Sequence, residues 1–286
     1  MTKITKVTKK NPHPFVKWAG GKRQLSEIIR SLIPNKYNTY FEPLIGGGAI
    51  LFELLPRKAV INDYNKELIN TYEVIRDFPN KLITLLQIHS YNNSEEYFYE
   101  IRSMDRSKDF NSLSSVQKAA RFIYLNKTCF NGLYRVNRSN QFNVPYGRYK
   151  NPNIVDSDNI KKCSEYFNSN DIKILDGDYQ DALKLADEDD FIYLDPPYVP
   201  ISKTSSFTSY TDIDFIIKDQ IELKNQCDLL TKNKIKFLLS NSHNDFIIDL
   251  YKDYEIIEVN ANRSINSNSS KRGEVKEVLI RNYGDN

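Results

Sequence analysis

The chain has 286 residues, 40% of them hydrophobic and 27% charged, and a formal net charge of +3. This composition is typical of a globular protein with a sizeable core, and the charge alone indicates no partner. Three separated cysteines and three histidines form no disulfide framework and no zinc motif, which favours a reducing cytoplasm and no metal. No apolar stretch approaches a membrane span, so we expect no membrane contact.

The N-terminal part, residues 14–78, shows the pattern of a parallel α/β sheet. Residues 1–13 before it are expected to form a mobile tail. A helix is predicted from Gly20 to Ile33, then a short strand at 40–42 that runs into Gly46-Gly47-Gly48. A second helix, a strand at 59–61 and a helix capped by Asn65 follow.

Residues 79–167 differ from this pattern and are expected to form an inserted, mainly helical domain. They begin with helices, notably at 116–127, and become aromatic, polar and strand-like from Phe130 to Lys150. Residues 168–286 return to the α/β pattern. The expected strands there are 172–175, 191–194, 235–239, 254–259 and 275–280, and the expected helices are 180–186, 214–230 and 245–251.

The most informative motif is Asp195-Pro196-Pro197-Tyr198, which follows the apolar run 191–194 directly. The run predicts a buried strand, and two prolines must end it in a rigid, extended turn. Such a turn holds a carboxylate, free carbonyls and an aromatic ring at a strand end. This set suits a planar base with an exocyclic amine, although a proline-stiffened loop without function is an equal alternative on the motif alone.

A second motif is the glycine turn at 46–48, followed by Asp63 at the end of the next strand. Glycines between strand and helix let a ligand approach the main chain, and a strand-end acid can accept bonds from ribose hydroxyls. The spacing fits neither a dinucleotide fingerprint nor a phosphate-binding loop. We interpret the pair as a site for a nucleoside-containing cofactor.

The third motif interleaves cations, amides and rings from Lys127 to Lys150. Lysine and arginine neutralise phosphates, arginine and asparagine contact base edges, and rings stack on bases. A solvated basic loop is the simpler alternative, but the mixture of residue types on one hairpin-like element favours nucleic acid.

Together these motifs resemble the Dam family of N6-adenine DNA methyltransferases, especially its DpnM-like, GATC-specific members from restriction–modification systems. The matching segments are Phe15 to Arg23, Phe41 to Gly48, Ile61 to Asp63, Phe130 to Lys150, Asp195 to Tyr198 and Arg272 to Tyr283. One departure is Phe130, where the family commonly has tyrosine. The resemblance implies a Rossmann-like methyltransferase sheet, with cofactor binding and catalysis in 14–78 and 168–286 and DNA target recognition in 79–167.

The resemblance also implies S-adenosyl-L-methionine as cofactor and double-stranded DNA containing GATC as substrate. A restriction endonuclease acting on the same site would be a possible counterpart. The implied cofactor contacts are Trp18, Gly20, Lys22, Glu42, Gly46, Gly48, Asp63, Asp178, Tyr179 and Asp195. The implied DNA contacts are Lys17, Phe130, Asn131, Leu133, Arg135, Asn137 and Pro145.

The catalytic residues would be Asp195, Pro196 and Tyr198. Adenine N6 lies inside the duplex, so the base must be extruded before it meets a methyl donor. Hydrogen bonds to the Asp195 carboxylate and the Pro196 carbonyl would stabilise the charge that develops on the amine. Alternatives are an N4-cytosine methyltransferase, whose motif more often begins with serine, and an adenine methyltransferase with another target. An RNA or protein-glutamine methyltransferase would more typically carry asparagine at position 195, and a non-catalytic DNA-binding protein would not need the cofactor motifs.

Overall fold

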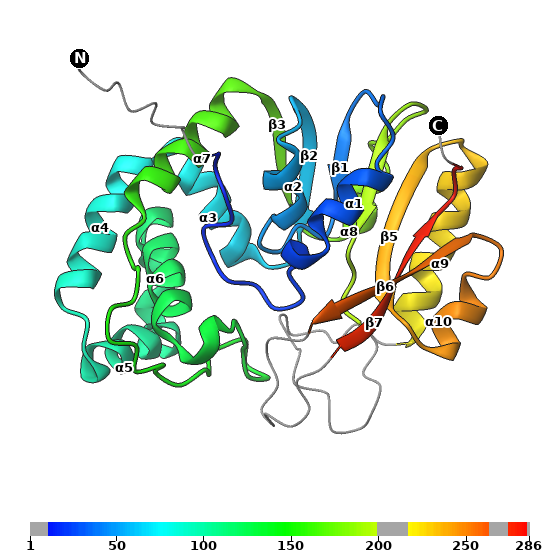
Figure 1. Cartoon of the computed structure of the whole chain (residues 1–286). Coiled ribbons are helices and arrows are strands. Elements are labelled where there is room, and N and C mark those ends of the chain that lie inside the picture. Colours follow the sequence, from blue (N-terminus) through cyan, green and yellow to red (C-terminus); the bar gives the residue numbers. More distant parts are fainter. Residues whose placement is uncertain (1–10, 199–216, 263–273, 285–286) are drawn as a thin grey trace, which may run out of the picture.

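A computed structural model describes residues 11–198, 217–262 and 274–284, and a seven-stranded sheet forms its centre (Figure 1). The strand order is β3-β2-β1-β4-β5-β7-β6. The pairings among β1 to β5 are parallel, whereas β7 runs antiparallel to both β5 and β6. The strands are β1 (Tyr40–Glu42), β2 (Lys58–Asp63), β3 (Asp171–Asp176), β4 (Phe191–Leu194), β5 (Lys236–Ser242), β6 (Glu255–Asn262) and β7 (Glu274–Arg281).

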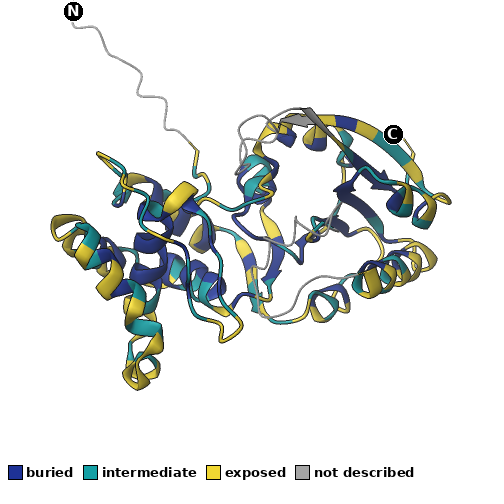
Figure 2. Ribbon diagram, turned by 90° about the horizontal axis from the view of Figure 1, so that it is seen from below, coloured by how far each residue is buried: buried dark blue, intermediate teal, exposed yellow. Residues whose placement is uncertain are grey.

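The central strands β1 and β4 are buried along their whole length, as expected for parallel strands covered on both faces. Two apolar clusters lie on the two faces. One joins Tyr40, Ile61 and Tyr193 of the strands to α1 (Ser26–Leu32), α2 (Ala49–Leu54) and α3 (Lys66–Asp77). The other joins alternate strand residues, such as Phe41 and Ile192, to α8 (Tyr179–Leu183), α9 (Ile217–Lys232) and α10 (Asp245–Leu250). Figure 2 shows this burial on the inner sides of the elements.

A group of helices lies beside the β3 side of the sheet, at the left of Figure 1. It contains α4 (Pro79–Tyr91), α5 (Glu95–Ser103), α6 (Ser115–Thr128) and α7 (Ser157–Ser169), with short 3-10 turns η2 (Met104–Arg106), η3 (Lys108–Ser112) and η4 (Phe130–Gly132). Helix α6 packs on α3, α4 and α5. Its buried Arg121 lies 2.7 Å from Asp105 Oδ2 and 3.7 Å from Glu67 Oε1, which ties the helical group to α3.

Several local expectations hold. Asn65 caps α3 by accepting a hydrogen bond from Leu68 N at 3.0 Å, as predicted. The expected strands are present with shifts of a few residues at their ends. The helix expected at 116–127 is α6, which begins with a capping box formed by Ser114 and Gln117.

Three local expectations differ from the structure. The helix predicted from Gly20 starts as a 3-10 turn, η1 (Lys22–Gln24), and becomes α-helical only at Ser26, because Gly20 has a φ of +76° that no helix contains. The stretch expected to be strand-like, 130–150, takes part in two isolated antiparallel bridges, Cys129–Tyr146 and Val136–Phe142, in place of regular strands. The predicted helix 180–186 ends at Leu183.

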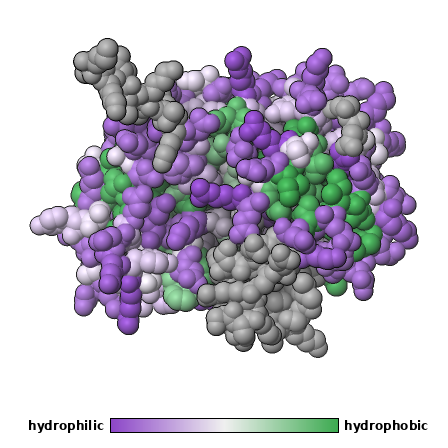
Figure 3. All heavy atoms as spheres, viewed as in Figure 1, coloured by the Kyte–Doolittle hydropathy of each residue, from purple (hydrophilic) through white to green (hydrophobic). Residues whose placement is uncertain are grey.

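Some expectations concern segments outside the described residues. These are most of the tail at 1–13 and the start of the helix expected from 214. Within the described part of the chain, no helix is both long and apolar enough to cross a membrane. The surface seen from the direction of Figure 1 is mainly hydrophilic, with apolar side chains gathered toward the sheet on the right (Figure 3).

Candidate active site

Acidic residues gather at the carboxyl edge of the parallel strands. Glu42 ends β1, Asp63 ends β2, and Asp195 follows β4 directly. Strands β1 and β4 are neighbours, and the strand order reverses direction between them. Open α/β sheets bind ligands at this kind of position, where the connections leave to opposite sides and open a crevice.

The turn after β4 holds Asp195 against a buried lysine. Lys22 Nζ lies 2.8 Å from Asp195 Oδ1, and the Lys22 side chain is only 4% exposed. The same ammonium donates to Gly20 O at 2.8 Å. Ser240 of β5 also donates to Asp195 Oδ1, at 3.0 Å. Burial raises the pKa of the Asp195 carboxyl, and Lys22 and Ser240 oppose this shift.

The ring of Tyr198 is fixed from two sides. Lys22 Nζ lies 4.6 Å from the ring centroid, a cation–π distance. The Tyr198 hydroxyl donates to Glu277 Oε2 of β7 at 2.6 Å, and Glu277 Oε2 lies 3.9 Å from Lys22 Nζ. One lysine therefore contacts both ends of the predicted catalytic turn, and the antiparallel strand β7 supplies the acid that anchors the ring.

Two more side chains connect the Pro197 carbonyl to β5. Gln220 of α9 donates to Pro197 O at 3.0 Å, and Asn241 of β5 donates to Gln220 Oε1 at 2.9 Å. Pro196 is buried and Pro197 is exposed. Because both prolines also have a fixed φ, the turn is preorganised before any ligand arrives.

The glycine turn packs against an aromatic ring. Gly46 has a φ of +48°, and a Cβ on it would lie 2.7 Å from Trp18 Cδ1. A Cβ on Gly48, where φ is +71°, would lie 2.6 Å from the Tyr72 hydroxyl, which donates to Gly46 O at 2.9 Å. Only glycine fits this conformation and this close packing.

Asp63 stabilises the same turn. Its Oδ2 accepts from Gly46 N at 2.9 Å and its Oδ1 accepts from Asn65 N at 2.9 Å. Burial raises the pKa of Asp63, and these main-chain bonds lower it. The strand-end acid that the sequence predicts as a ribose contact is therefore also a structural anchor of the glycine turn.

Glu42 is buried at the end of β1 and accepts a hydrogen bond from the Tyr40 hydroxyl at 2.8 Å. Burial raises its pKa to about 8, and the nearby charge of Asp195 adds to that shift. Neutral pH therefore lies below the pKa of this buried carboxyl. A cationic ligand bound at the site would favour its ionised form.

The end of β3 is tied to the end of β2. Asn62 donates to Gly177 O at 3.0 Å, and Gly177 N donates to Asp63 O at 3.2 Å. Asp178 is exposed and caps α8 through Gln180 N at 2.8 Å. Tyr179 is half-buried against the second apolar cluster. These two residues lie at the β3 end of the edge, away from the Asp195 turn.

The segment after α6 brings the predicted DNA contacts to one exposed turn. Phe130 is 52% exposed, and the exposed Asn131 has a φ of +58°. Phe130 N donates to the main-chain oxygen of the exposed Pro145 at 2.8 Å. Leu133 is half-buried and follows directly. The main chain of Phe130 is fixed by this hydrogen bond while its ring is exposed, so the ring is available for stacking.

Further along, Arg135 Nε donates to Asn143 Oδ1 at 2.7 Å. This contact holds one edge of the guanidinium, so the terminal nitrogens are the pair that could meet a base edge. The Asn137 side chain stabilises the tip of the turn, where its Oδ1 accepts hydrogen bonds from Ser139 N and Gln141 N at 3.0 Å each. The sequence-based assignment of Asn137 as a DNA contact stays a prediction.

Lys17 and Trp18 connect the two parts of the site. The Lys17 side chain packs on Gly132, where a Cβ would lie 2.4 Å from Lys17 Cδ, and Lys17 Nζ lies 5.4 Å from the Tyr149 ring. The Trp18 ring stacks on Tyr134 at 5.6 Å. The first segment of the described chain thus contacts both the glycine turn and the block that is predicted to face DNA.

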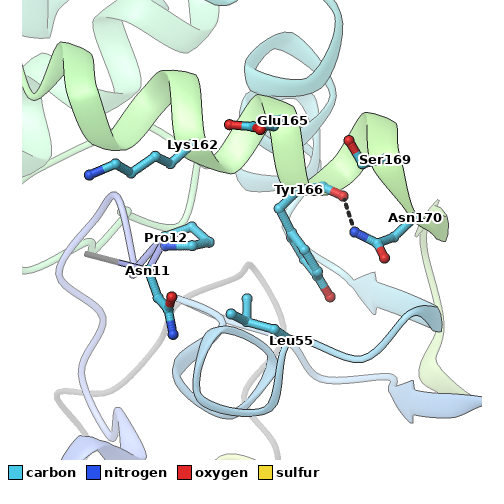
Figure 4. Close-up of a pocket in the computed structure, with 8 residues that line it drawn as sticks. All are labelled: Asn11, Pro12, Leu55, Lys162, Glu165, Tyr166, Ser169 and Asn170. Atoms are coloured by element: carbon cyan, nitrogen blue, oxygen red, sulfur yellow. Dashed lines mark hydrogen bonds between the residues drawn. The ribbon is translucent and has the colours of Figure 1, made fainter. Parts of the chain in front are cut away.

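A separate pocket lies at the opposite edge of the strands, beside the start of β3 (Figure 4). Its lining includes Leu55, Tyr166 and Asn170, where the Asn170 side chain donates to Tyr166 O at 2.8 Å. It is remote from the acidic edge. No group of three or more potential metal ligands occurs in the described ranges.

Sequence reasoning missed three residues that hold the predicted catalytic turn: Glu277, Ser240 and Gln220. Ser240 had a usable signal, because it follows the apolar run 237–239 and begins a polar cluster as the strand ends. Glu277 is one of two acids in β7, and its contact with Tyr198 depends on the antiparallel position of that strand.

The chain is similar to known DNA methyltransferases. The signature of the D12 class N6 adenine-specific DNA methyltransferases matches residues 18–265. The type II methyltransferase M1.LlaDCHI of Lactococcus lactis subsp. cremoris is 51% identical, covering 96% of this chain and 97% of that protein. The type II methyltransferase M.MjaIII of Methanocaldococcus jannaschii is 43% identical, covering 94% and 99%.

A DNA adenine methylase of Haemophilus influenzae is 33% identical, and the match covers 93% of this chain and 92% of that protein. The chain belongs to the D12 class of N6 adenine-specific DNA methyltransferases. It is an N6 adenine-specific DNA methyltransferase, and the predicted methyltransferase fold and family are confirmed.

Proposed function

We propose that this enzyme transfers a methyl group from S-adenosyl-L-methionine to N6 of adenine in GATC sequences of double-stranded DNA, after extruding the base. The observation that carries the proposal is the Asp195 turn, held between Lys22 and Glu277 at the point where the strand order reverses. The site residues below are assigned on chemistry and geometry.

The residues at the strand ends fit S-adenosyl-L-methionine. The molecule carries two positive charges and two ribose hydroxyls, and Glu42, Asp63 and Asp195 supply carboxylates along one edge. Gly46 and Gly48 supply a main-chain cradle that a Cβ would fill. We assign Trp18, Gly20 and Lys22 to the methionine end, Asp63 to the ribose, and Asp178 and Tyr179 to the adenine ring.

The chemistry requires that the amine of adenine be made nucleophilic, because its lone pair is delocalised into the ring. When bound, the cofactor supplies an electrophilic methyl group. Lys22 and Ser240 both contact Asp195 Oδ1, so we assign the amine to Oδ2 and to the Pro196 carbonyl. These acceptors stabilise the positive charge that develops on nitrogen, and the anchored Tyr198 ring fixes the base plane.

The base has to leave the helix, because the Asp195 turn is partly buried at a strand end that a stacked base cannot reach. We assign Phe130 and Asn131 to the gap that the extruded base leaves. Phe130 is an exposed ring on a rigid turn, and apolar wedges of this kind compensate for lost stacking.

Sequence reading is assigned to the block around residues 130–150. Arg135, with Nε held by Asn143, presents its terminal nitrogens to a guanine. Lys17, Leu133 and Pro145 complete the predicted base contacts, and Asn137 shapes the tip. We therefore propose that 79–167 is the target-recognition domain, and that 14–78 with 168–286 binds cofactor and performs catalysis.

The relatives named type II methyltransferases support a role in a restriction–modification system, with a nuclease that cuts the same unmethylated site. This nuclease shares the DNA sequence as its target, and no direct contact with it is required. An adenine methyltransferase with another target sequence is the alternative.

The test is transfer of tritiated methyl groups from S-adenosyl-L-methionine to matched duplexes. One duplex contains GATC, one has a single base of the site changed, and one has N6-methyladenine already at both target positions. Label should enter only the first duplex and should be recovered as N6-methyladenine after digestion. Recovery as N4-methylcytosine, or equal labelling of the first two duplexes, would contradict the proposal.

A further inference from the structure

Two buried asparagines hold the N-terminal segment against the helices in the same way. Asn159 of α7 accepts from His13 N at 2.9 Å and donates to His13 O at 2.8 Å. Asn126 of α6 accepts from Lys17 N at 2.8 Å and donates to Lys17 O at 2.8 Å. The two residues are 3% and 1% exposed. Each amide therefore satisfies both main-chain groups of one residue, as a paired strand would.

Asn126 differs in one additional contact. Its Nδ2 also donates to Gly132 O at 3.0 Å, in the η4 turn. An amide nitrogen has two donors, and here one holds Lys17 while the other holds the turn that presents Phe130 and Asn131. A single side chain thus fixes the N-terminal segment and the DNA-facing turn relative to each other.

The residue next to Lys17 contacts the cofactor cradle. Trp18 lies so close to Gly46 that a Cβ there would be 2.7 Å from its ring, and it stacks on Tyr134 at 5.6 Å. Lys17 precedes Trp18 in the chain, and Asn126 connects the main chain of Lys17 to that of Gly132. A packed, hydrogen-bonded path therefore runs from the glycine turn to the exposed turn.

We propose that Asn126 is a positioning residue that couples occupancy of the cofactor cradle to DNA affinity, by holding Lys17 and Gly132 as one unit. The proposal rests on the function proposed above. Coupling between two binding sites is reciprocal, so either ligand should strengthen binding of the other by the same factor. Asn159, which lacks the contact to the turn, serves as the matched control.

The experiment measures DNA affinity by fluorescence anisotropy on a GATC duplex, without and with saturating S-adenosylhomocysteine, which cannot donate a methyl group. The ratio of the two dissociation constants is the coupling factor. We expect about fivefold or more in the unmodified enzyme. The factor should fall close to one in Asn126→Ala and stay at the unmodified value in Asn159→Ala.

A second readout separates positioning from general loss of stability. Trp18 is the single tryptophan of the chain, so its emission reports directly on this segment. DNA alone should change that emission in the unmodified enzyme and in Asn159→Ala, but not in Asn126→Ala. If Asn126→Ala does not fold, Asn126→Ser, which keeps one hydroxyl donor, replaces it in both measurements.

Equal coupling factors in the unmodified enzyme and the Asn126 variant would overturn the proposal, and so would a factor of one in the unmodified enzyme. Either result leaves the proposed function standing as long as the unmodified enzyme methylates the GATC duplex. If that enzyme neither binds S-adenosylhomocysteine nor methylates DNA, the proposed function fails and this inference fails with it.

Discussion

Lys22 and Asp195 lie far apart in the sequence, yet Nζ of the lysine is 2.8 Å from Oδ1 of the aspartate and both side chains lie largely out of solvent. Burial raises the pKa of Asp195, and the lysine charge is the main factor that opposes the shift. The ion pair therefore favours the ionised carboxylate, which is the stronger acceptor for the hydrogen bond from the amine that we propose.

Lys22→Gln should move the acidic limb of the pH profile for methyl transfer to higher pH. Removing the positive charge raises the pKa of Asp195 further, so the active carboxylate is lost at a higher pH than before. The measurement is kcat at saturating cofactor and DNA across the acidic and neutral range. Lys150→Gln, on the exposed block, should leave the limb in place, and an unmoved limb in Lys22→Gln would show that the ion pair does not set the charge of Asp195.

Glu42→Gln should change how stability depends on pH. Burial raises the pKa of Glu42 from 4.5 to about 8 in the folded protein. The folded state then holds a proton that the unfolded state has lost, so this group stabilises fully below pH 4.5 and its contribution falls as pH rises to about 8. Glutamine cannot ionise, so the variant lacks this decrease in stability with rising pH.

Urea unfolding of Glu42→Gln and the unmodified enzyme at several pH values between 5 and 8 tests this prediction. The variant should gain stability relative to the unmodified enzyme as pH rises through this window. Glu96→Gln, at an exposed position of α5, is the control. Parallel stability curves for Glu42→Gln and the unmodified enzyme would mean that Glu42 titrates normally.

Asp63→Ala should weaken binding of S-adenosyl-L-methionine. A hydrogen bond to a charged group contributes roughly 1.5–3 kcal/mol. Asp63 also accepts from Gly46 N at 2.9 Å, so the variant loosens the glycine turn in addition to losing a ribose contact. Calorimetric titration gives the affinity directly. Tyr72→Phe, which removes only the contact to Gly46 O, estimates the share that comes from the turn. Unchanged affinity in Asp63→Ala would mean that another residue contacts the ribose.

The strand-end acids could be predicted because each follows its own apolar run. Asp63 ends β2 and Asp195 follows β4. Because the strands are parallel, their carboxyl ends lie at one edge of the sheet. Glu277 and Asn126 could not be predicted, because their roles depend on contacts between distant segments. Asn126 sits inside an apolar helical run, where the pattern says only that the position is buried.

The local structure of residues 130–150 also depends on contacts with a distant segment, and the sequence did not predict it. Its composition predicts a DNA-facing element, but regular strands are replaced by contacts from the helical group. Asp105 accepts from Phe142 N at 2.8 Å, and Arg106 donates to Phe142 O at 2.8 Å. Side chains of a neighbouring turn thus satisfy main-chain groups that a strand ladder would otherwise pair.

Arg135→Ala should relax the requirement for the outer G·C pair of GATC more than it weakens non-specific binding. A bidentate arginine–guanine contact discriminates by roughly 1–3 kcal/mol. Lys150→Ala is the matched comparison, because we expect Lys150 to contact only phosphate. Loss of a phosphate contact weakens binding to all sequences alike and reduces the salt dependence. The measurement is methylation rate on GATC and its single-base variants at two salt concentrations. A uniform loss in Arg135→Ala would identify a phosphate contact.

The most direct test of the account is single-turnover methyl transfer to a GATC duplex by Asp195→Ala, with cofactor affinity measured on the same preparation. Loss of one preorganised acceptor should lower the rate by about a hundred- to a thousand-fold or more. S-adenosyl-L-methionine should still bind, with a much smaller loss of affinity than of rate, because the other assigned cofactor contacts remain. A rate near that of the unmodified enzyme would contradict the assignment of the Asp195 turn as the catalytic centre.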